Sequence, residues 1–140
     1  SKEVGLLCGL NRTHNRYTIK TCKTKMNLVD MARDFRRAYE VKDSPENEQM
    51  QMDLITEEMK EFEASAAFDT DAEALKELCD LVYVCAQYAA NQDWDLDEAL
   101  KRVHESNLTK LGSDGKPLRR ADGKVMKGPN YKPPALTDLV

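Results

Sequence analysis

The 140-residue chain has few aromatic side chains and no long apolar run, and these shortages exclude several classes of protein. Aromatic residues make up 6% and charged residues 33%, a balance that favours a helical domain over a β-sandwich. No apolar run approaches the roughly 20 residues that span a bilayer, and the first residues show no clear signal-peptide cleavage site. The formal net charge of −4 argues against a general nucleic-acid binder. We therefore expect a cytoplasmic protein with neither a membrane nor a nucleic-acid partner.

The cysteines also lack the spacing of a metal site. None of Cys8, Cys22, Cys79 and Cys85 belongs to a CxxC pair, which a structural zinc site commonly uses. Cys79 and Cys85 fall within an apolar helical pattern, so we expect them to be reduced thiols in the core. The sequence gives no indication of a zinc site.

Apolar side chains recur at helical spacing in four segments, which predicts an all-α domain. The expected helices are 28–40, 45–67, 72–91 and 96–110. Ser44 followed by Pro45 is a typical start for the second helix, and Asp95 with Glu98 resembles a capping box at the start of the fourth. The third helix is apolar nearly all round after Asp80, so we expect it to be central.

The C-terminal segment has a different composition. Two Asp-Gly-Lys sequences and several prolines predict turns and a short hairpin or extended arm. Residues 107–132 contain seven lysines or arginines and two aspartates, a local net charge of +5. We therefore divide the chain into an N-terminal extension of unknown role (1–26), a helical bundle (27–111), and a basic arm of the same domain (112–140).

Two pairs of carboxylates indicate a metal site. Glu58 and Glu61 lie three residues apart, as do Glu77 and Asp80, so each pair shares one face of its helix beside the apolar stripe. An antiparallel packing of the two helices would bring the pairs together, where they would repel each other unless a cation neutralised them. Mg²⁺ prefers such oxygen ligands. A solvated helix face is the alternative, because glutamate is common on helix surfaces.

These motifs resemble those of a known family. EEMKE at residues 57–61 and ELCD at 77–80 resemble the EExxE and ExxD motifs of the MazG-like all-α nucleoside triphosphate pyrophosphohydrolases, which include phosphoribosyl-ATP pyrophosphohydrolase and the dimeric dUTPases. VHESNLTKL at 103–111, with the DGK, ADGKVMKG and NYKPPAL segments that follow, resembles a narrower subgroup. The resemblance covers residues 27–136 and implies a four-to-five-helix bundle of the all-α NTP pyrophosphatase type.

The resemblance also implies an activity and its residues. Water would attack the α-phosphorus of a nucleoside triphosphate, giving a nucleoside monophosphate and pyrophosphate, with Mg²⁺ as the cofactor and Mn²⁺ as a substitute. The metal ligands would be Glu58, Glu61, Glu77 and Asp80. Glu57 would bind a second ion or orient the water. The residues expected to contact the substrate are Asn107, Lys110, Lys124, Lys127 and Tyr131.

The choice of substrate is less well defined. We favour a common nucleoside or deoxynucleoside triphosphate, with a purine deoxynucleotide preferred. A dUTP- or phosphoribosyl-ATP-specific pyrophosphohydrolase is the alternative enzyme, and a non-catalytic nucleotide-binding module is the alternative outside catalysis. Four helices of this size leave the third exposed, so we expect a homodimer or homotetramer.

Overall fold

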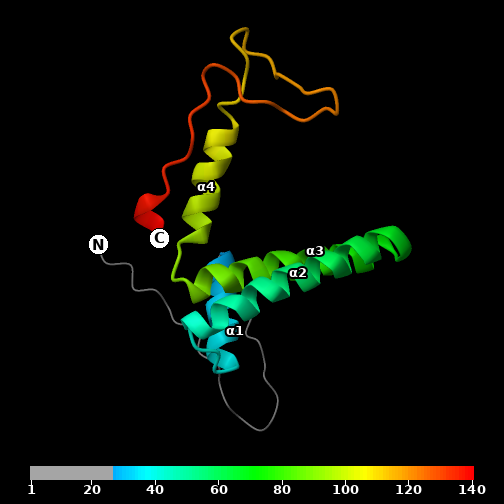
Figure 1. Cartoon of the computed structure of the whole chain (residues 1–140), viewed down its shortest axis with the longest axis vertical. Coiled ribbons are helices and arrows are strands. Elements are labelled where there is room, and N and C mark those ends of the chain that lie inside the picture. The colour runs from blue at the N-terminus through cyan, green and yellow to red at the C-terminus, as the bar shows by residue number, and fades with distance from the viewer. Residues whose placement is uncertain (1–26) are drawn as a thin grey trace.

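The computed structural model describes residues 27–140, and the expected extension at 1–26 lies outside this part. Its helices are α1 (Leu28–Ala38), α2 (Pro45–Phe68), α3 (Asp71–Asn91) and α4 (Leu96–Asn107), followed by a 3₁₀ turn, η1 (Thr137–Leu139) (Figure 1). Apart from two isolated β-bridges, residues 27–140 contain no β-structure. The expected all-α fold is confirmed. None of the helices in this part is long and apolar enough to cross a membrane.

Each α-helix begins at a side chain that caps its first turn. Ser44 accepts from Asn47 N at 3.3 Å, as expected from the Ser-Pro sequence. Asp95 accepts from Glu98 N at 3.1 Å, again as expected. The full capping box lies instead at the start of α3, where the Thr70 backbone N–H also donates to the Glu73 carboxylate. Such a cap stabilises a helix by about 1 kcal/mol. Because the capping residue and the backbone group that it bonds lie within one turn, the local sequence indicates where these helices start.

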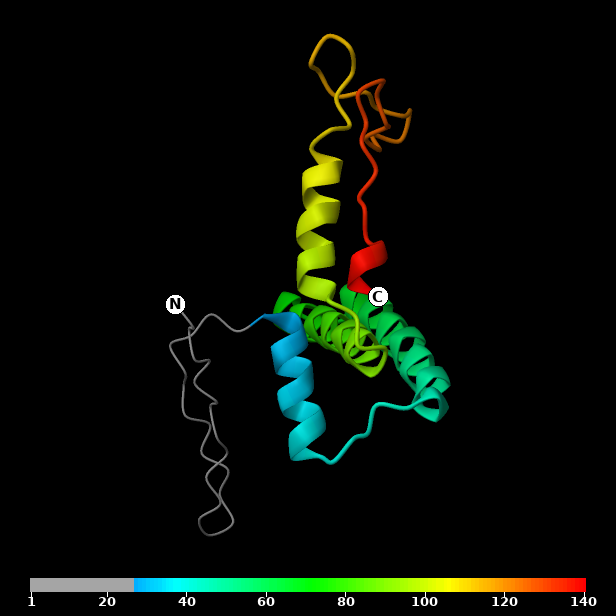
Figure 2. The same cartoon turned by 90° about the vertical axis from the view of Figure 1, so that its left-hand side faces the viewer.

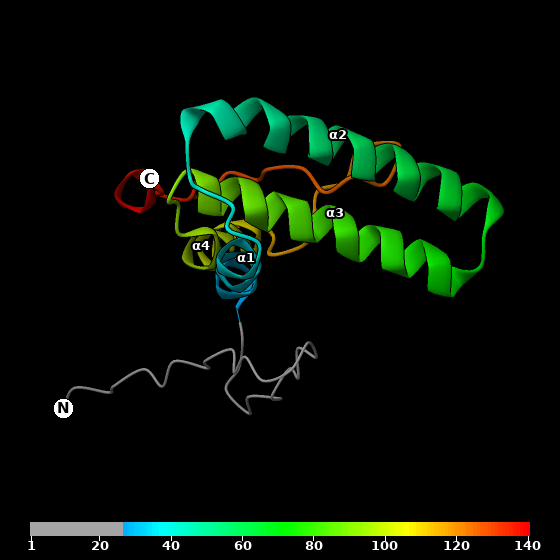
Figure 3. The ribbon, with the colours of Figure 1, turned by 90° about the horizontal axis from the view of Figure 1, so that it is seen from below.

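The helices α2 and α3 form a long antiparallel pair, and α1 packs across the C-terminal half of α3 (Figure 3). The small buried core consists of Ala32 from α1 with Ala86 and Ala90 from α3, and Leu28 and Leu96 pack against it. Alanine at these positions lets the two helices approach closely. The buried core therefore lies in the C-terminal half of α3, and in Figure 3 the first half of α3 runs beside α2.

A buried polar network fixes α1 against α3. The side chain of Arg36 is 4% exposed and donates to Asp43 Oδ1 at 2.8 Å, Asn91 Oδ1 at 2.8 Å and Gln87 Oε1 at 3.2 Å. A buried guanidinium is tolerated only when its donors are satisfied, and these acceptors come from α3 and the loop after α1. The network therefore sets the position of α1 over α3.

The helix α4 projects away from the α2–α3 pair, and the C-terminal arm returns along it (Figure 2). Ser106 Oγ donates to Lys132 O at 2.6 Å, and Lys132 N donates to Thr109 Oγ1 at 2.8 Å. Closer to the start of α4, Arg102 pairs with Asp138 at 2.6 Å. These contacts hold the arm on α4.

The expected hairpin is present in the segment between the end of α4 and the part of the arm that returns along α4. Isolated antiparallel bridges join Leu111 to Pro117 and Arg119 to Val125. Each bridge closes over an Asp-Gly-Lys turn, in which Gly115 has φ +75° and Gly123 has φ +87°. A side chain at either glycine would be strained, so glycine is required there.

Some of the apolar residues that recur at helical spacing, and that would face inward in a helical bundle, are exposed. Leu75, Leu78 and Val82 on α3 are 61%, 39% and 42% exposed, and Leu100 on α4 is 53% exposed. Cys79 is likewise exposed, so it is no core thiol. The reason is the direction of α4, which leaves one side of α3 without a covering helix. The prediction that α3 is central holds only for its C-terminal half.

Candidate metal centre

Three carboxylates from two helices meet on the side of the α2–α3 pair. Glu58 of α2 and Glu77 and Asp80 of α3 each offer one oxygen, and these oxygens lie within 4.8 Å of one another. The three-residue spacing of Glu77 and Asp80 places both on one face of α3, and the antiparallel packing brings Glu58 opposite them. The geometry that the motif spacing predicts is therefore present for three of the four expected ligands.

The fourth expected ligand and the expected catalytic residue lie at the edge of this group. Glu61 is exposed and is not one of the three clustered residues, although its charge acts on Glu58. Glu57 is also exposed. Both lie within one helical turn of Glu58, so each is close to the centre along the chain without being part of the group.

The clustered carboxylates are poorly compensated. Glu58 Oε2 and Glu77 Oε2 are buried and have no hydrogen-bond partner among the described residues. Burial raises the pKa of Glu58, and the charge of Glu61 raises it further. Asp80 and Glu77 raise this pKa as well. Burying carboxylate oxygens without a partner is unfavourable in free energy, so a positive charge near the three carboxylates would stabilise them.

Lys76 supplies part of that charge. Its ammonium group donates to Asp80 Oδ2 at 2.7 Å and to Glu77 Oε1 at 3.1 Å. These bonds, the one to Asp80 first, raise the pKa of Lys76. Lys76 was not among the predicted site residues, although its spacing of four from Asp80 is the usual one for a helical ion pair. Because Lys76 is 64% exposed, its side chain can leave without disturbing the fold.

The donor set fits a hard divalent cation. All three clustered residues offer carboxylate oxygens, and the buried Oε2 atoms of Glu58 and Glu77 have no hydrogen-bond partner among the described residues. Mg²⁺ and Mn²⁺ prefer oxygen ligands, and Mg²⁺ is usually bound through a few carboxylates and completed by water or phosphate. Glu58, Glu77 and Asp80 would hold such an ion.

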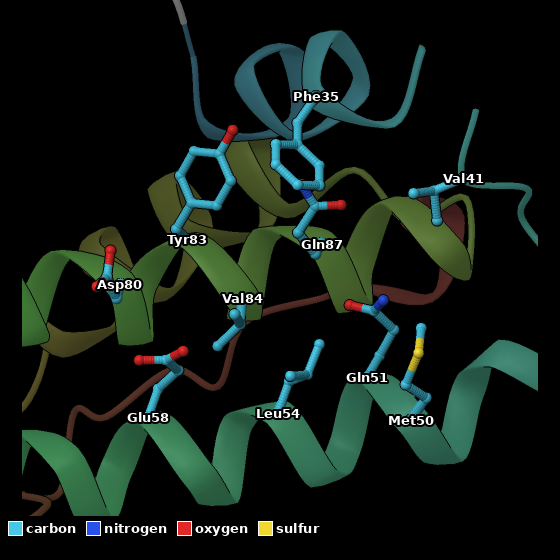
Figure 4. Close-up of a pocket in the computed structure, with 10 residues that line it drawn as sticks. All are labelled: Phe35, Val41, Met50, Gln51, Leu54, Glu58, Asp80, Tyr83, Val84 and Gln87. Atoms are coloured by element: carbon cyan, nitrogen blue, oxygen red, sulfur yellow. The ribbon is translucent and has the colours of Figure 1, made fainter. Parts of the chain in front are cut away.

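A pocket extends from the carboxylates toward the base of the α2–α3 pair (Figure 4). It has a volume of about 520 Å³ and lies between α1, α2 and α3. Glu58 and Asp80 line one end, and Phe35 and Tyr83 contact each other edge-to-face over it, with ring centroids 5.8 Å apart. The remaining lining residues are Val41, Met50, Gln51, Leu54, Val84 and Gln87. An apolar cleft with a few polar groups is typical of a small-molecule site.

The expected substrate-binding residues lie elsewhere in this chain. Asn107 is the last residue of α4, Lys110 follows it, and the other three lie in the arm, which projects away from α2 and α3 (Figures 1 and 2). Two of them contact each other, since Lys127 Nζ lies 4.7 Å from the centre of the Tyr131 ring. Lys124 is exposed in the second turn. None of these residues lines the pocket or belongs to the carboxylate group.

Comparison with known proteins supports the resemblance that the motifs indicate. The family model described as phosphoribosyl-ATP pyrophosphohydrolase matches residues 30–107, more than half of the chain. The matched range includes the three clustered carboxylates and every residue of the pocket. No curated protein sequence matches the chain.

Proposed function

Since the chain belongs to the phosphoribosyl-ATP pyrophosphohydrolase family and is thereby a nucleotide pyrophosphohydrolase, we propose that it hydrolyses a nucleoside or deoxynucleoside triphosphate in the presence of Mg²⁺. The products would be the nucleoside monophosphate and pyrophosphate. The observation that carries this proposal is the group of Glu58, Glu77 and Asp80, with its two unpartnered buried oxygens. Mg²⁺ bound there would neutralise phosphate charge and polarise the α-phosphoryl group.

The side chains of the centre have separate roles in this proposal. Glu58, Glu77 and Asp80 would hold the ion, and Glu61, one turn further along α2, would be the fourth ligand. Water forms a new bond to the α-phosphorus while the bond from that phosphorus to the bridging oxygen breaks, and pyrophosphate leaves. Glu57 orients this water and accepts its proton. The exposure of Glu57 leaves it free to reach a water molecule at the edge of the group.

We also propose that the active form is a homodimer or homotetramer in which one copy's arm completes the other copy's site. Residues 27–111 would form the catalytic bundle, and residues 112–140 would form the basic arm of the same domain. Leu75, Leu78 and Val82 present an uncovered apolar surface beside the carboxylates. A second copy on this surface would bury it and bring a positively charged arm to a negatively charged centre. Asn107 and Lys110 of that copy would then contact the phosphates.

The reaction is tested by incubating the protein with each common NTP and dNTP, and with phosphoribosyl-ATP, in Mg²⁺ or EDTA. Chromatography should resolve a monophosphate and pyrophosphate only in Mg²⁺. Glu58→Gln and Asp80→Asn should each abolish turnover, while Glu63→Gln, on the exposed face of α2, should retain it. Diphosphate with inorganic phosphate as products, or full turnover by the Glu58 variant, would contradict the proposal.

The same panel addresses the substrate. We favour a purine deoxynucleoside triphosphate, and the family match is equally compatible with phosphoribosyl-ATP. A dUTP-specific enzyme is the remaining alternative. The rates over the panel, compared as kcat/KM, rank these substrates directly.

A further inference from the structure

One buried polar side chain of the pocket has no partner. Gln51 is 4% exposed, and its Oε1 finds no hydrogen-bond partner among residues 27–140. Figure 4 shows its amide extending from α2 toward α3, between the apolar side chains of Leu54 and Met50. A buried amide oxygen without a partner costs about 1–3 kcal/mol. A bound ligand that donates a hydrogen bond to this oxygen would remove that cost.

A second glutamine in the same pocket provides the contrast. Gln87 is 5% exposed, and both ends of its amide are used within the protein. Its Oε1 accepts from Arg36 Nη1 at 3.2 Å, and its Nε2 donates to Ala32 O at 3.3 Å. Gln87 therefore holds the helices together, whereas Gln51 remains available to a bound molecule.

The position of Gln51 relative to the carboxylates matches the length of a nucleotide. Gln51 precedes Glu58 by seven residues, which places the two side chains on one face of α2 about 10 Å apart along its axis. This separation is comparable with the length of a nucleoside 5′-phosphate. A nucleotide whose α-phosphate lies at the carboxylates would extend its base into the apolar part of the pocket and reach Gln51.

We propose that Gln51 is the residue that recognises the substrate base, which lies in the pocket beneath Phe35 and Tyr83. The proposal rests on the function proposed above. A glutamine amide offers an acceptor and a donor side by side, so it pairs with a base edge that presents a donor next to an acceptor, as adenine does through N6 and N7. Burial excludes water that would otherwise compete for this bond, which makes a mismatched base costly.

The test compares base preference in the wild type, in Gln51→Met and in Gln49→Met. The second change is the same substitution on the exposed face of α2. Binding of the nucleoside 5′-monophosphates in Mg²⁺ is measured by calorimetry, and kcat/KM is measured for the dNTPs. In both measurements, we expect Gln51→Met to reduce the ratio between the best and the worst base by about tenfold. The loss of one buried hydrogen bond changes an equilibrium or rate ratio by about that factor. Gln49→Met should keep the wild-type preference.

A second variant tests the chemistry of the contact. Gln51→Glu keeps an acceptor and loses the donor, so the relative preference should move toward guanine, which presents two donors at N1 and N2. An equal loss of affinity for every base in Gln51→Met would mean that Gln51 only packs, and would overturn the proposal. Equal affinity of the wild type for all bases would also overturn it. Base-selective binding through Gln51 without hydrolysis of any nucleotide would leave this proposal standing and refute only the proposed reaction.

Discussion

Replacing Glu77 by glutamine is expected to stabilise the metal-free protein while removing one of the proposed metal ligands. The Glu77 side chain is 19% exposed and one of its oxygens is buried without a partner. Its carboxylate lies within 4.8 Å of those of Glu58 and Asp80. At that distance two like charges repel by about 3 kcal/mol at an effective dielectric constant of about 20, and by about 1 kcal/mol in bulk water.

The net effect is smaller than the sum of these repulsions. Lys76 also donates to Glu77, so the variant loses that favourable contact. The new amide can donate to a neighbouring carboxylate in its place. We therefore expect Glu77→Gln to raise the free energy of unfolding by about 1 kcal/mol in the absence of metal, which for a chain of this length raises Tm by about 3 °C.

The assay is thermal unfolding followed by circular dichroism, in EDTA and in a titration of MgCl₂. The wild type should gain stability with Mg²⁺ as a ligand of the folded state, by about 1.4 kcal/mol when Mg²⁺ reaches ten times its dissociation constant. Glu77→Gln should begin higher in EDTA and gain much less. Glu63→Gln, on an exposed face, should follow the wild type in both conditions. A lower Tm for Glu77→Gln in EDTA, or an equal response to Mg²⁺, would refute the reasoning.

Two further predictions concern the arm and the residues just after α4. The hydrogen bond from Arg102 lowers the pKa of Asp138 below its ordinary value of 3.8, so this ion pair stabilises the fold above that pH and is lost as the pH falls below it. Asp138→Asn should therefore lower Tm at pH 7, and its difference from the wild type should shrink toward pH 3; a constant difference across this range would contradict the assignment. Mixing two inactive variants, Glu58→Gln and Lys110→Ala, should restore about a quarter of wild-type activity if Lys110 of one copy serves the other copy's site, because half of the dimers are mixed and each then has one intact site. No recovery after the subunits have exchanged would mean that each site takes Glu58 and Lys110 from the same copy.

The starts of the helices were predictable from sequence because their signals are local. Ser44 and Pro45 act within one turn, and α2 begins where they predict. The ends were less predictable. The first helix stops at Ala38 rather than at residue 40, because Glu40 adopts a left-handed conformation with φ +55°. The fourth stops at Asn107, and just beyond it Thr109 Oγ1 donates to Ser106 O and accepts from Lys132 N, a contact that spans 23 residues.

The candidate site shows the same division between local and long-range information. Helical spacing predicted that Glu58 would lie near Glu77 and Asp80. That prediction requires only that each motif lies on one face of its helix and that the two helices pack antiparallel. Helical spacing could not predict Gln51, whose significance depends on the absence of a partner on α3. Nor could it place the arm, because the direction of α4 is set by contacts with α1 and η1 rather than by any property of α4 alone.

The position of the carboxylate group along α3 explains how the protein tolerates three like charges close together. The alanines that pack α1 on α3 lie at Ala86 and Ala90, whereas the carboxylates lie in the uncovered half, beside exposed Leu78 and Val82. Three like charges within the packed half would destabilise the fold severely. At the boundary they remain half in water, so a hydrated cation can enter and keep its waters. A second copy covering this surface would lower the local dielectric constant and strengthen the attraction between the carboxylates and that cation. The same uncovered surface would therefore link the proposed assembly to the affinity of the proposed metal centre.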